Sequence, residues 1–551
     1  MLCIENSPKD GAALLKEGAD RSHVLWPTAL GTPWSGLLLS AVLFAVSLAI
    51  RLPGLTLIPR YSDEGFEVLQ GLDIASGRAF PLTGVNPYYG PLFAYFVAGL
   101  FRLLGVHLET PRLVAALFGA LTVVVAFWLG CLVRGHVAGL VAGAVTATMP
   151  SLVLYTSHHG WATSLTPGLV LAMLAVLYAG ATRRNSLLLA LSGLLAALAL
   201  QSHPAAAVAL IGALVWLVYT LGAREMLKGW GGYAALALFL LGYAPVIVAN
   251  ANAANSIFHI AAEHTSPFAP TIQPTVYIMR ATVFAKELLL TMGGQMVGVG
   301  LPSNWTLRLL VALTGLLVAV GLALSWTRDR LVAIVFVTSV VLLPLFVAPL
   351  NYRYFAFLLP LGAVAVGIVV EVLWQANRWA HPAWPSWSGR LARALVLGWL
   401  GVQLLLSWST MTTYYERMVA EGRTNAEYFR LAELARSSGA CGAGLVIEET
   451  MLNLSDPNAT QLWYASHAID YVLTMDDCSH VLSSSQTIRS ELEGHAAPIW
   501  LIAPEPSSAT YAPYLGLPAA GVVSPAPVAS TLIPFGLYQV VSPWRGAPGE
   551  D

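Results

Sequence analysis

Charged residues are scarce in this sequence. Asp, Glu, Lys and Arg make up 10% of the 551 residues, whereas a soluble domain carries roughly 25%. The 28 basic and 29 acidic residues nearly cancel, so no strong field draws in nucleic acid or another highly charged partner. Four cysteines without a Cys-x-x-Cys pair exclude a zinc ribbon and a dense disulfide framework. The sequence also lacks a P-loop, a dinucleotide-binding glycine motif and a nucleophile elbow.

Hydrophobic residues make up 57% of the sequence and form long apolar runs. These runs indicate a polytopic membrane protein. A bilayer core needs about 20 apolar residues per helix. Eleven runs fit, at about 37–50, 111–133, 137–156, 164–181, 186–201, 204–222, 230–250, 305–326, 331–349, 354–374 and 391–411.

A twelfth run, 91–104, is short, and counting it as a span would reverse the side of every later loop. Leaving it out puts most loop arginines and lysines on the inner side, as the positive-inside rule favours. We therefore expect a juxtamembrane or re-entrant helix at 91–104, on the outer surface.

The resulting domain organisation has three parts. We expect a cytoplasmic tail at 1–33, a transmembrane domain at 34–411 with outer loops at 53–110 and 251–304, and an extracytoplasmic α/β domain at 412–551. In the last part the residue pattern predicts a helix at 425–437 and strands at 444–447, 497–503 and 531–541. Cys441 and Cys478 could form a disulfide there in an oxidising compartment, or remain as two buried thiols.

An acidic pair, Asp63-Glu64, follows the first span directly. Ionisable groups at a membrane border are costly and are therefore candidates for function. The alternative is helix capping, with Ser62 or Asp63 as the N-cap and Glu64 in a first turn favoured by the helix dipole.

The order of these segments resembles the GT-C glycosyltransferases, in particular the family of protein O-mannosyltransferases and lipid A aminoarabinose transferases. The resemblance covers about residues 35–375. It is carried by the acidic pair in Tyr61–Gly65, the Pro-aromatic stretch Asn86–Leu92, the pair Glu263-His264 in the long outer loop, and the late segment Asn351–Pro360. The fold that this implies is a GT-C-type bundle of about eleven transmembrane helices.

The resemblance implies a multi-pass enzyme of the plasma membrane. It would transfer a hexose or pentose from a polyprenyl-phosphate donor to an acceptor hydroxyl on the outer side, with inversion. Asp63 would be the general base, and Glu64 would orient the acceptor, bind a metal or only cap the helix. Arg353 would bind the leaving phosphate, although snorkelling to the interface is an alternative. The other expected substrate contacts are Tyr88, Tyr89, Glu263, His264 and Tyr352.

Two departures from the family pattern stand out. Many members carry a second acid in the turn after the third span, but residues 155–164 here contain no Asp or Glu. His158 or His159 could replace it and form a divalent-metal site with Asp63 and Glu64, or could make unrelated interfacial hydrogen bonds. The aminoarabinose transferases have a Lys where this sequence has Gly90, so we do not expect their reaction.

Two other functions remain open at this point. A transporter or flippase of a lipid-linked or amphiphilic substrate would use the same apolar scaffold, but such proteins tend to carry charges near the bilayer midplane and inverted repeats. A surface-polysaccharide ligase would share the lipid-phosphate donor, but normally lacks an acidic pair directly after the first span. The sequence does not identify the acceptor.

Overall fold

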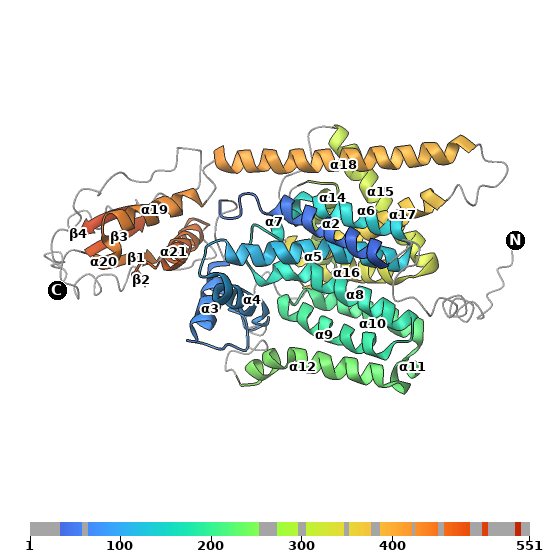
Figure 1. Ribbon diagram of the computed structural model, residues 1–551, viewed down its shortest axis with the longest axis horizontal. Coiled ribbons are helices and arrows are strands. Elements are labelled where there is room, and N and C mark those ends of the chain that lie inside the picture. The colour runs from blue at the N-terminus through green and yellow to red at the C-terminus, as the bar shows by residue number, and fades with distance from the viewer. Residues whose placement is uncertain are drawn as a thin grey trace.

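A computed structural model of the chain describes residues 33–57, 64–252, 273–295, 305–346, 352–375, 386–420, 425–449, 457–475, 477–484, 499–504 and 535–540. Most of its helices form one bundle, and a small α/β domain lies at one end of that bundle (Figure 1). The predicted fold class, a helical membrane bundle with a small α/β domain, is confirmed.

Each predicted span coincides with a helix or with a helix in two pieces. They are α2 (Pro33–Arg51), α5 (Thr110–Val133), α6 (His136–Thr148) with α7 (Pro150–Tyr155), η2 (Ala162–Leu165) with α8 (Thr166–Thr182), α9 (Ser186–Ser202), α10 (Ala206–Leu221), α12 (Trp230–Asn252), α15 (Trp305–Arg328), α16 (Leu331–Phe346), α17 (Leu358–Gln375) and α18 (Ser386–Ala420). Among the described residues, six helices are long and apolar enough to cross a membrane, namely α2, α5, the joined η2 and α8, α12, α15 and α17.

Five further helical segments complete the membrane domain. They are α3 (Glu64–Ser76), α4 (Leu92–Leu104), α11 (Ala223–Lys228), α14 (Pro274–Met292) and η3 (Tyr352–Tyr354). The run at 91–104 is α4, whose 13 residues are too few to span a bilayer core and which packs on α3. Both lie at the end of the bundle that carries the α/β domain, whereas α11 lies at the opposite end (Figure 1).

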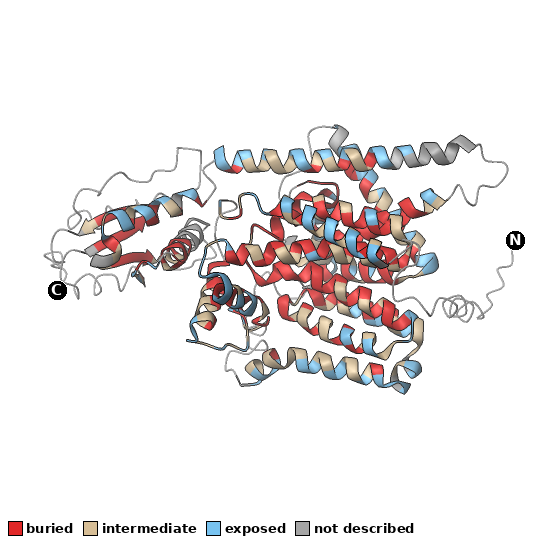
Figure 2. Ribbon diagram, in the orientation of Figure 1, coloured by how far each residue is buried: buried red, intermediate tan, exposed pale blue. Residues whose placement is uncertain are grey.

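Small residues and prolines explain how the helices pack and where they break. Gly193 lies against the backbone of Ala235, and Gly367 lies against that of Ala138, so a side chain at either glycine would overlap the facing helix. Small residues at such contacts are typical of membrane helices. Pro150 begins α7 after an extended Met149, and this break lets the chain turn at the site described below. The interior of the bundle is buried, and exposed apolar residues cover its outside (Figure 2).

The α/β domain contains α19 (Ala426–Ser437), α20 (Ala440–Ala443), α21 (Pro457–Met475) and the strands β1 (Leu445–Glu449), β2 (Val481–Ser484), β3 (Ile499–Pro504) and β4 (Phe535–Val540). The strand order is β2-β1-β3-β4. β1 pairs in parallel with β2 and β3, with Val446 opposite Val481 and Leu501, and β4 pairs antiparallel with β3. The predicted helix at 425–437 and all three predicted strands are confirmed as α19, β1, β3 and β4.

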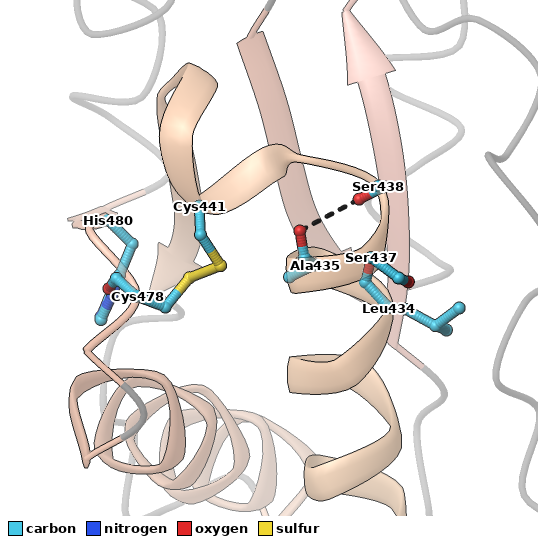
Figure 3. Close-up of a disulfide and its surroundings, with 7 residues drawn as sticks. All are labelled: Leu434, Ala435, Ser437, Ser438, Cys441, Cys478 and His480. Atoms are coloured by element: carbon cyan, nitrogen blue, oxygen red, sulfur yellow. Dashed lines mark hydrogen bonds between the residues drawn. A yellow bond between two sulfur atoms is a disulfide. The ribbon is translucent and has the colours of Figure 1, made fainter.

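A disulfide joins Cys441 in α20 to Cys478, three residues beyond the end of α21 (Figure 3). Of the two alternatives for these cysteines, the structure therefore has the bonded one. The bond fixes the far end of α21 against α20.

Candidate active site

Two buried carboxylates on α3 face the turn between α7 and η2. Glu64 is 2% exposed and Glu67 is 8% exposed, and their spacing of three residues puts both on one face of the helix. The Gly160 N–H donates to Glu64 Oε2, and the Ala162 N–H donates to Glu67 Oε2. Position 160 has to be glycine for this approach, because a Cβ there would lie 2.8 Å from the Pro111 Cβ.

Glu64 also forms a buried ion pair with Arg112 in the first turn of α5. The Arg112 Nε lies 3.0 Å from Glu64 Oε1 and 3.3 Å from Oε2, and Nη2 also donates to Oε1. The Arg112 Nη1 donates to the Leu55 carbonyl at 2.6 Å. This pair balances the charge of Glu64 and fixes its position, so that Glu64 is poorly suited to accept a proton.

Glu67, which the sequence analysis did not select, is bound to Tyr89. The Tyr89 hydroxyl donates to Glu67 Oε1 at 2.9 Å. Burial, together with the negative charge of Glu67, raises the pKa of Tyr89 well above its usual range, so the phenol stays protonated. The signal that could have found Glu67 is its position one helical turn after Glu64 in a predicted helix. Tyr88, the other predicted contact, packs edge-on against Tyr89 with ring centroids 5.2 Å apart.

The same turn provides an aromatic surface for Arg353. The Arg353 guanidinium carbon lies 5.5 Å from the centre of the Trp161 ring in this turn. It also lies 5.2 Å from the centre of the ring of its neighbour Tyr354, and both distances are within the range of cation–π attraction. The His159 ring stacks on Trp161 at 4.6 Å, and the His203 ring lies 5.1 Å from Tyr354. The Trp161 indole N–H and the Thr163 hydroxyl are buried and have no hydrogen-bond partner in the structure's described part.

The histidines around this turn are neutral at physiological pH. Burial lowers the pKa of His158 to about 4 and that of His159 to about 3, with the Arg112 guanidinium as the next cause in both cases. Burial and the positive charge of Arg353 lower the pKa of His203 to about 3. Arg353 is therefore a permanent cation among neutral rings.

His158, one of the two predicted metal ligands, is hydrogen-bonded within the protein. His158 Nε2 faces the Pro53 carbonyl at 3.0 Å and Nδ1 faces the Ser157 hydroxyl at 2.8 Å, so both ring nitrogens are engaged. Across the described ranges, no group of three or more His, Cys, Asp or Glu side chains is arranged to hold a metal ion. The predicted metal site also includes Asp63, which lies outside the described residues, so it stays a prediction.

The structure brings together five of the predicted site residues around this turn, namely Glu64, Tyr89, His158, His159 and Arg353. Tyr352 begins η3, directly before Arg353. Asp63, Glu263 and His264 lie outside the described residues. Their predicted roles stay predictions.

A third arginine, Arg51, which the sequence analysis did not select, ends α2 beside this turn. Arg51 is fully buried, and its side chain bonds the Ser47 hydroxyl at 2.6 Å and the Thr156 hydroxyl at 3.2 Å. It thereby joins the first span to the break at α7.

Gly90 packs against Gln201 at the end of α9. The Gly90 N–H donates to the Gln201 carbonyl at 2.7 Å, and a Cβ at position 90 would overlap the Gln201 side chain. The arrangement has no room for a lysine there, in keeping with the departure noted in the sequence.

Comparisons with known proteins agree with this fold. Residues 86–248 match the family model described as dolichyl-phosphate-mannose-protein mannosyltransferase. No curated protein matches the chain.

Among solved structures, ArnT from Cupriavidus metallidurans bound to undecaprenyl phosphate is 16% identical, with a TM-score of 0.57 over 94% of this chain and 100% of that chain. The apo oligosaccharyltransferase from Archaeoglobus fulgidus is 10% identical, with a TM-score of 0.51 over 87% of this chain and 70% of that chain. The resemblance to the GT-C glycosyltransferase superfamily is thereby confirmed, and the chain has the GT-C fold.

Proposed function

We propose that this protein is a membrane glycosyltransferase that moves a sugar from a polyprenyl-phosphate donor to an acceptor hydroxyl, with inversion and with Asp63 as the general base. The observation that carries the proposal is the position of Arg353. Its guanidinium lies over the ring of Trp161, between Gly160 and Ala162, whose N–H groups bind Glu64 and Glu67. A site for an anion and a carboxylate-bearing helix therefore meet at one turn.

Arg353 suits the phosphate of a lipid-linked donor. A guanidinium binds phosphate oxygens through paired N–H groups and stays charged at all physiological pH values. The neighbouring Trp161 and Tyr354 rings offer apolar faces, on which a sugar ring or an isoprenoid unit could pack. The matched family's description, which names dolichyl-phosphate mannose, and the undecaprenyl phosphate bound to ArnT both support a donor of this class.

The transfer is a single displacement. The acceptor hydroxyl gives its proton to the Asp63 carboxylate while its oxygen forms a bond to the anomeric carbon of the sugar. The bond from that carbon to the phosphate oxygen breaks, and polyprenyl phosphate leaves with the electron pair. Arg353 stabilises the charge that grows on the leaving phosphate. Glu64, which Arg112 already neutralises, acts as a positioning residue for the loop that carries its neighbour Asp63.

The reaction would take place on the outer side of the plasma membrane. The turn that holds Trp161 and the α/β domain lie at one end of the bundle, and α11, with Arg224 and Lys228, lies at the other (Figure 1). The positive-inside rule assigns the second end to the cytoplasm. The Cys441–Cys478 disulfide supports an oxidising compartment for the first end.

The test is a comparison of the wild type with Asp63→Asn. Both proteins are purified in mild detergent, and co-purified lipids are identified by mass spectrometry. We expect a polyprenyl phosphate carrying a sugar, whose mass gives the sugar class. Asp63→Asn should retain this lipid but transfer no sugar to acceptors in a membrane extract, because it lacks the base and keeps the Arg353 site.

Asp477→Asn is a matched control, since this aspartate lies in the exposed turn beyond α21 and outside the site. The control should transfer at the wild-type rate. Full transfer by Asp63→Asn would remove the assigned base. A wild-type protein that neither carries nor binds any polyprenyl phosphate would refute the donor class.

A further inference from the structure

The α/β domain contacts the membrane domain on both sides of the segment that carries Asp63. On the near side, Asn425 precedes α19 and is fully buried. Its backbone N–H donates to the Leu57 carbonyl at 2.7 Å, and its side-chain Nδ2 donates to the Thr56 carbonyl at 2.8 Å. One residue of the α/β domain thus holds the last two described residues before the acidic pair.

On the far side, α21 packs against the first turn of α3. The His467 ring lies 4.8 Å from the Phe66 ring, between centroids. Position 65 is glycine, and a Cβ there would lie 3.4 Å from the Tyr471 Cβ, so the helix backbone and α21 are in direct contact. His467 Nε2 in turn lies 3.3 Å from Glu449 Oε1 at the end of β1, which ties the ring to the sheet.

The helix that makes this contact is itself held at several points. α21 packs on α19 and β1. The Cys441–Cys478 disulfide attaches its far end to α20 (Figure 3). A displacement of α3 would therefore have to move a cross-linked domain and not a single side chain.

Asp63 is bonded directly to Glu64, and consecutive Cα atoms lie 3.8 Å apart. The position of the first turn of α3 also sets where Glu64 and Glu67 meet the N–H groups of Gly160 and Ala162. A catalytic group that moves by about 1 Å can lose about 100-fold in rate. We propose that the α/β domain is a positioning unit for the first turn of α3 and the Glu64 and Glu67 carboxylates that it carries, with Asn425 and His467 as its positioning residues. This inference rests on the proposed function.

Two variants weaken the two contacts separately. Asn425→Asp keeps the shape of the side chain but sets a carboxylate oxygen against the Thr56 carbonyl. His467→Ala removes the ring from Phe66, and His467→Phe restores a ring without the bond to Glu449. Glu433→Ala, at an exposed position of α19, is the matched control within the same domain.

The full-length protein in lipid nanodiscs is studied by two measurements. Amide hydrogen exchange reports the protection of residues 64–72, and turnover of undecaprenyl-phosphate mannose reports kcat and KM. We expect faster exchange at 64–72 in Asn425→Asp and His467→Ala, with kcat lower by about 10- to 100-fold and KM for the lipid unchanged. His467→Phe should recover most of the kcat of the wild type, and Glu433→Ala should match the wild type in both measurements.

The proposal is wrong if the exchange of residues 64–72 is unchanged in both variants, if the loss appears in KM with kcat intact, or if Glu433→Ala loses as much kcat. Exchange does not depend on the reaction. An active Asp63→Asn protein would thus remove the proposed base, while the exchange data would still decide whether the α/β domain holds α3.

Discussion

Both ends of the bundle bury carboxylates, but they surround them differently. At the end opposite the α/β domain, the Ala138 N–H donates to Glu371 Oε2 at 3.0 Å near the start of α6. At the same end, Asp329 accepts from the Ser325 hydroxyl at 2.8 Å and from backbone N–H groups at the start of α16. These two carboxylates cap helices, and each satisfies N–H groups that a helix start leaves without an intrahelical partner.

At the end with the α/β domain, the carboxylates of α3 bind Gly160 in the turn after α7 and Ala162 at the start of η2. Glu64 joins α3 to α5 through Arg112 and to Gly160. The same turn carries Trp161, which lies under the permanent charge of Arg353. Burial of a carboxylate is therefore common to both ends, and what distinguishes the site is the buried ion pair of Glu64 with Arg112 beside a cation that lies over the Trp161 ring.

The largest expected difference between the ends is in stability. Arg112→Leu leaves the buried Glu64 carboxylate without its ion-pair partner, and removal of one partner of a buried pair costs about 3–5 kcal/mol. Glu371→Gln keeps an oxygen that can accept from the Ala138 N–H, so it should cost only about 1 kcal/mol. Thermal unfolding in detergent, followed by tryptophan fluorescence, measures both. Equal shifts in the two variants would show that the Arg112 pair is no more than another cap.

The next effect concerns donor binding. Arg353→Ala should weaken the binding of undecaprenyl phosphate by about 10- to 100-fold, because a charge-assisted hydrogen bond contributes about 1.5–3 kcal/mol. Arg353→Lys keeps the charge but loses the planar fork and the stacking on Trp161, so it should bind the lipid several-fold more tightly than Arg353→Ala does.

Arg330→Ala is the matched control, since Arg330 also lies over an aromatic ring, that of Tyr219, but at the opposite end. Binding to protein in nanodiscs is measured with radiolabelled lipid. If Arg353→Ala binds like the wild type, Arg353 only snorkels to the interface.

Much of the fold follows from the sequence because its main signal is long and repeated. Runs of about 20 apolar residues predicted the eleven spanning segments of the bundle, and the distribution of arginine and lysine separated α4 from them, whereas α11 and α14 match none of these runs. The α/β domain was predicted only in part. Neither α21 nor β2 was predicted. β2 has only four residues, whereas α21 begins with a signal that could have found it, Asp456 directly before Pro457.

The site was predicted less completely than the fold, for a physical reason. Glu64, Tyr89 and Arg353 lie in segments that are distinctive in sequence. Glu67, Arg51 and Arg112 lie in or beside apolar helices, where one charged residue looks like an interfacial anchor until the fold shows what faces it. The partners come from 22 to 105 residues away in the chain, and no local pattern encodes such pairs.

The smallest expected effect is a difference in how the two ends respond to acid. His158, His159 and His203 have folded-state pKa values of about 4, 3 and 3, below the value of about 6.5 in an unfolded chain. Between these values the unfolded chain binds more protons, so the stability that the site contributes falls as the pH drops below about 6.5. Asp329 behaves in the opposite way, because burial raises its pKa from 3.8 to about 6. Between those two values the folded state binds more protons, and the opposite end is stabilised as the pH falls through about 6.

Each linked group changes the free energy of unfolding by at most about 1.4 kcal/mol per pH unit within its window. Local amide exchange at pH 7 and pH 5, corrected for the intrinsic rate, resolves such changes where the opening is local. Residues 155–165 should lose protection at pH 5, and residues 325–335 should gain it. Asp329→Asn should abolish the gain and leave the loss unchanged, because the amide does not titrate and lies at the far end from the histidines. A change in the same direction at both ends would mean that the response to acid is global, and the contrast between a neutral-histidine site and a carboxylate cap would then have no effect on local stability.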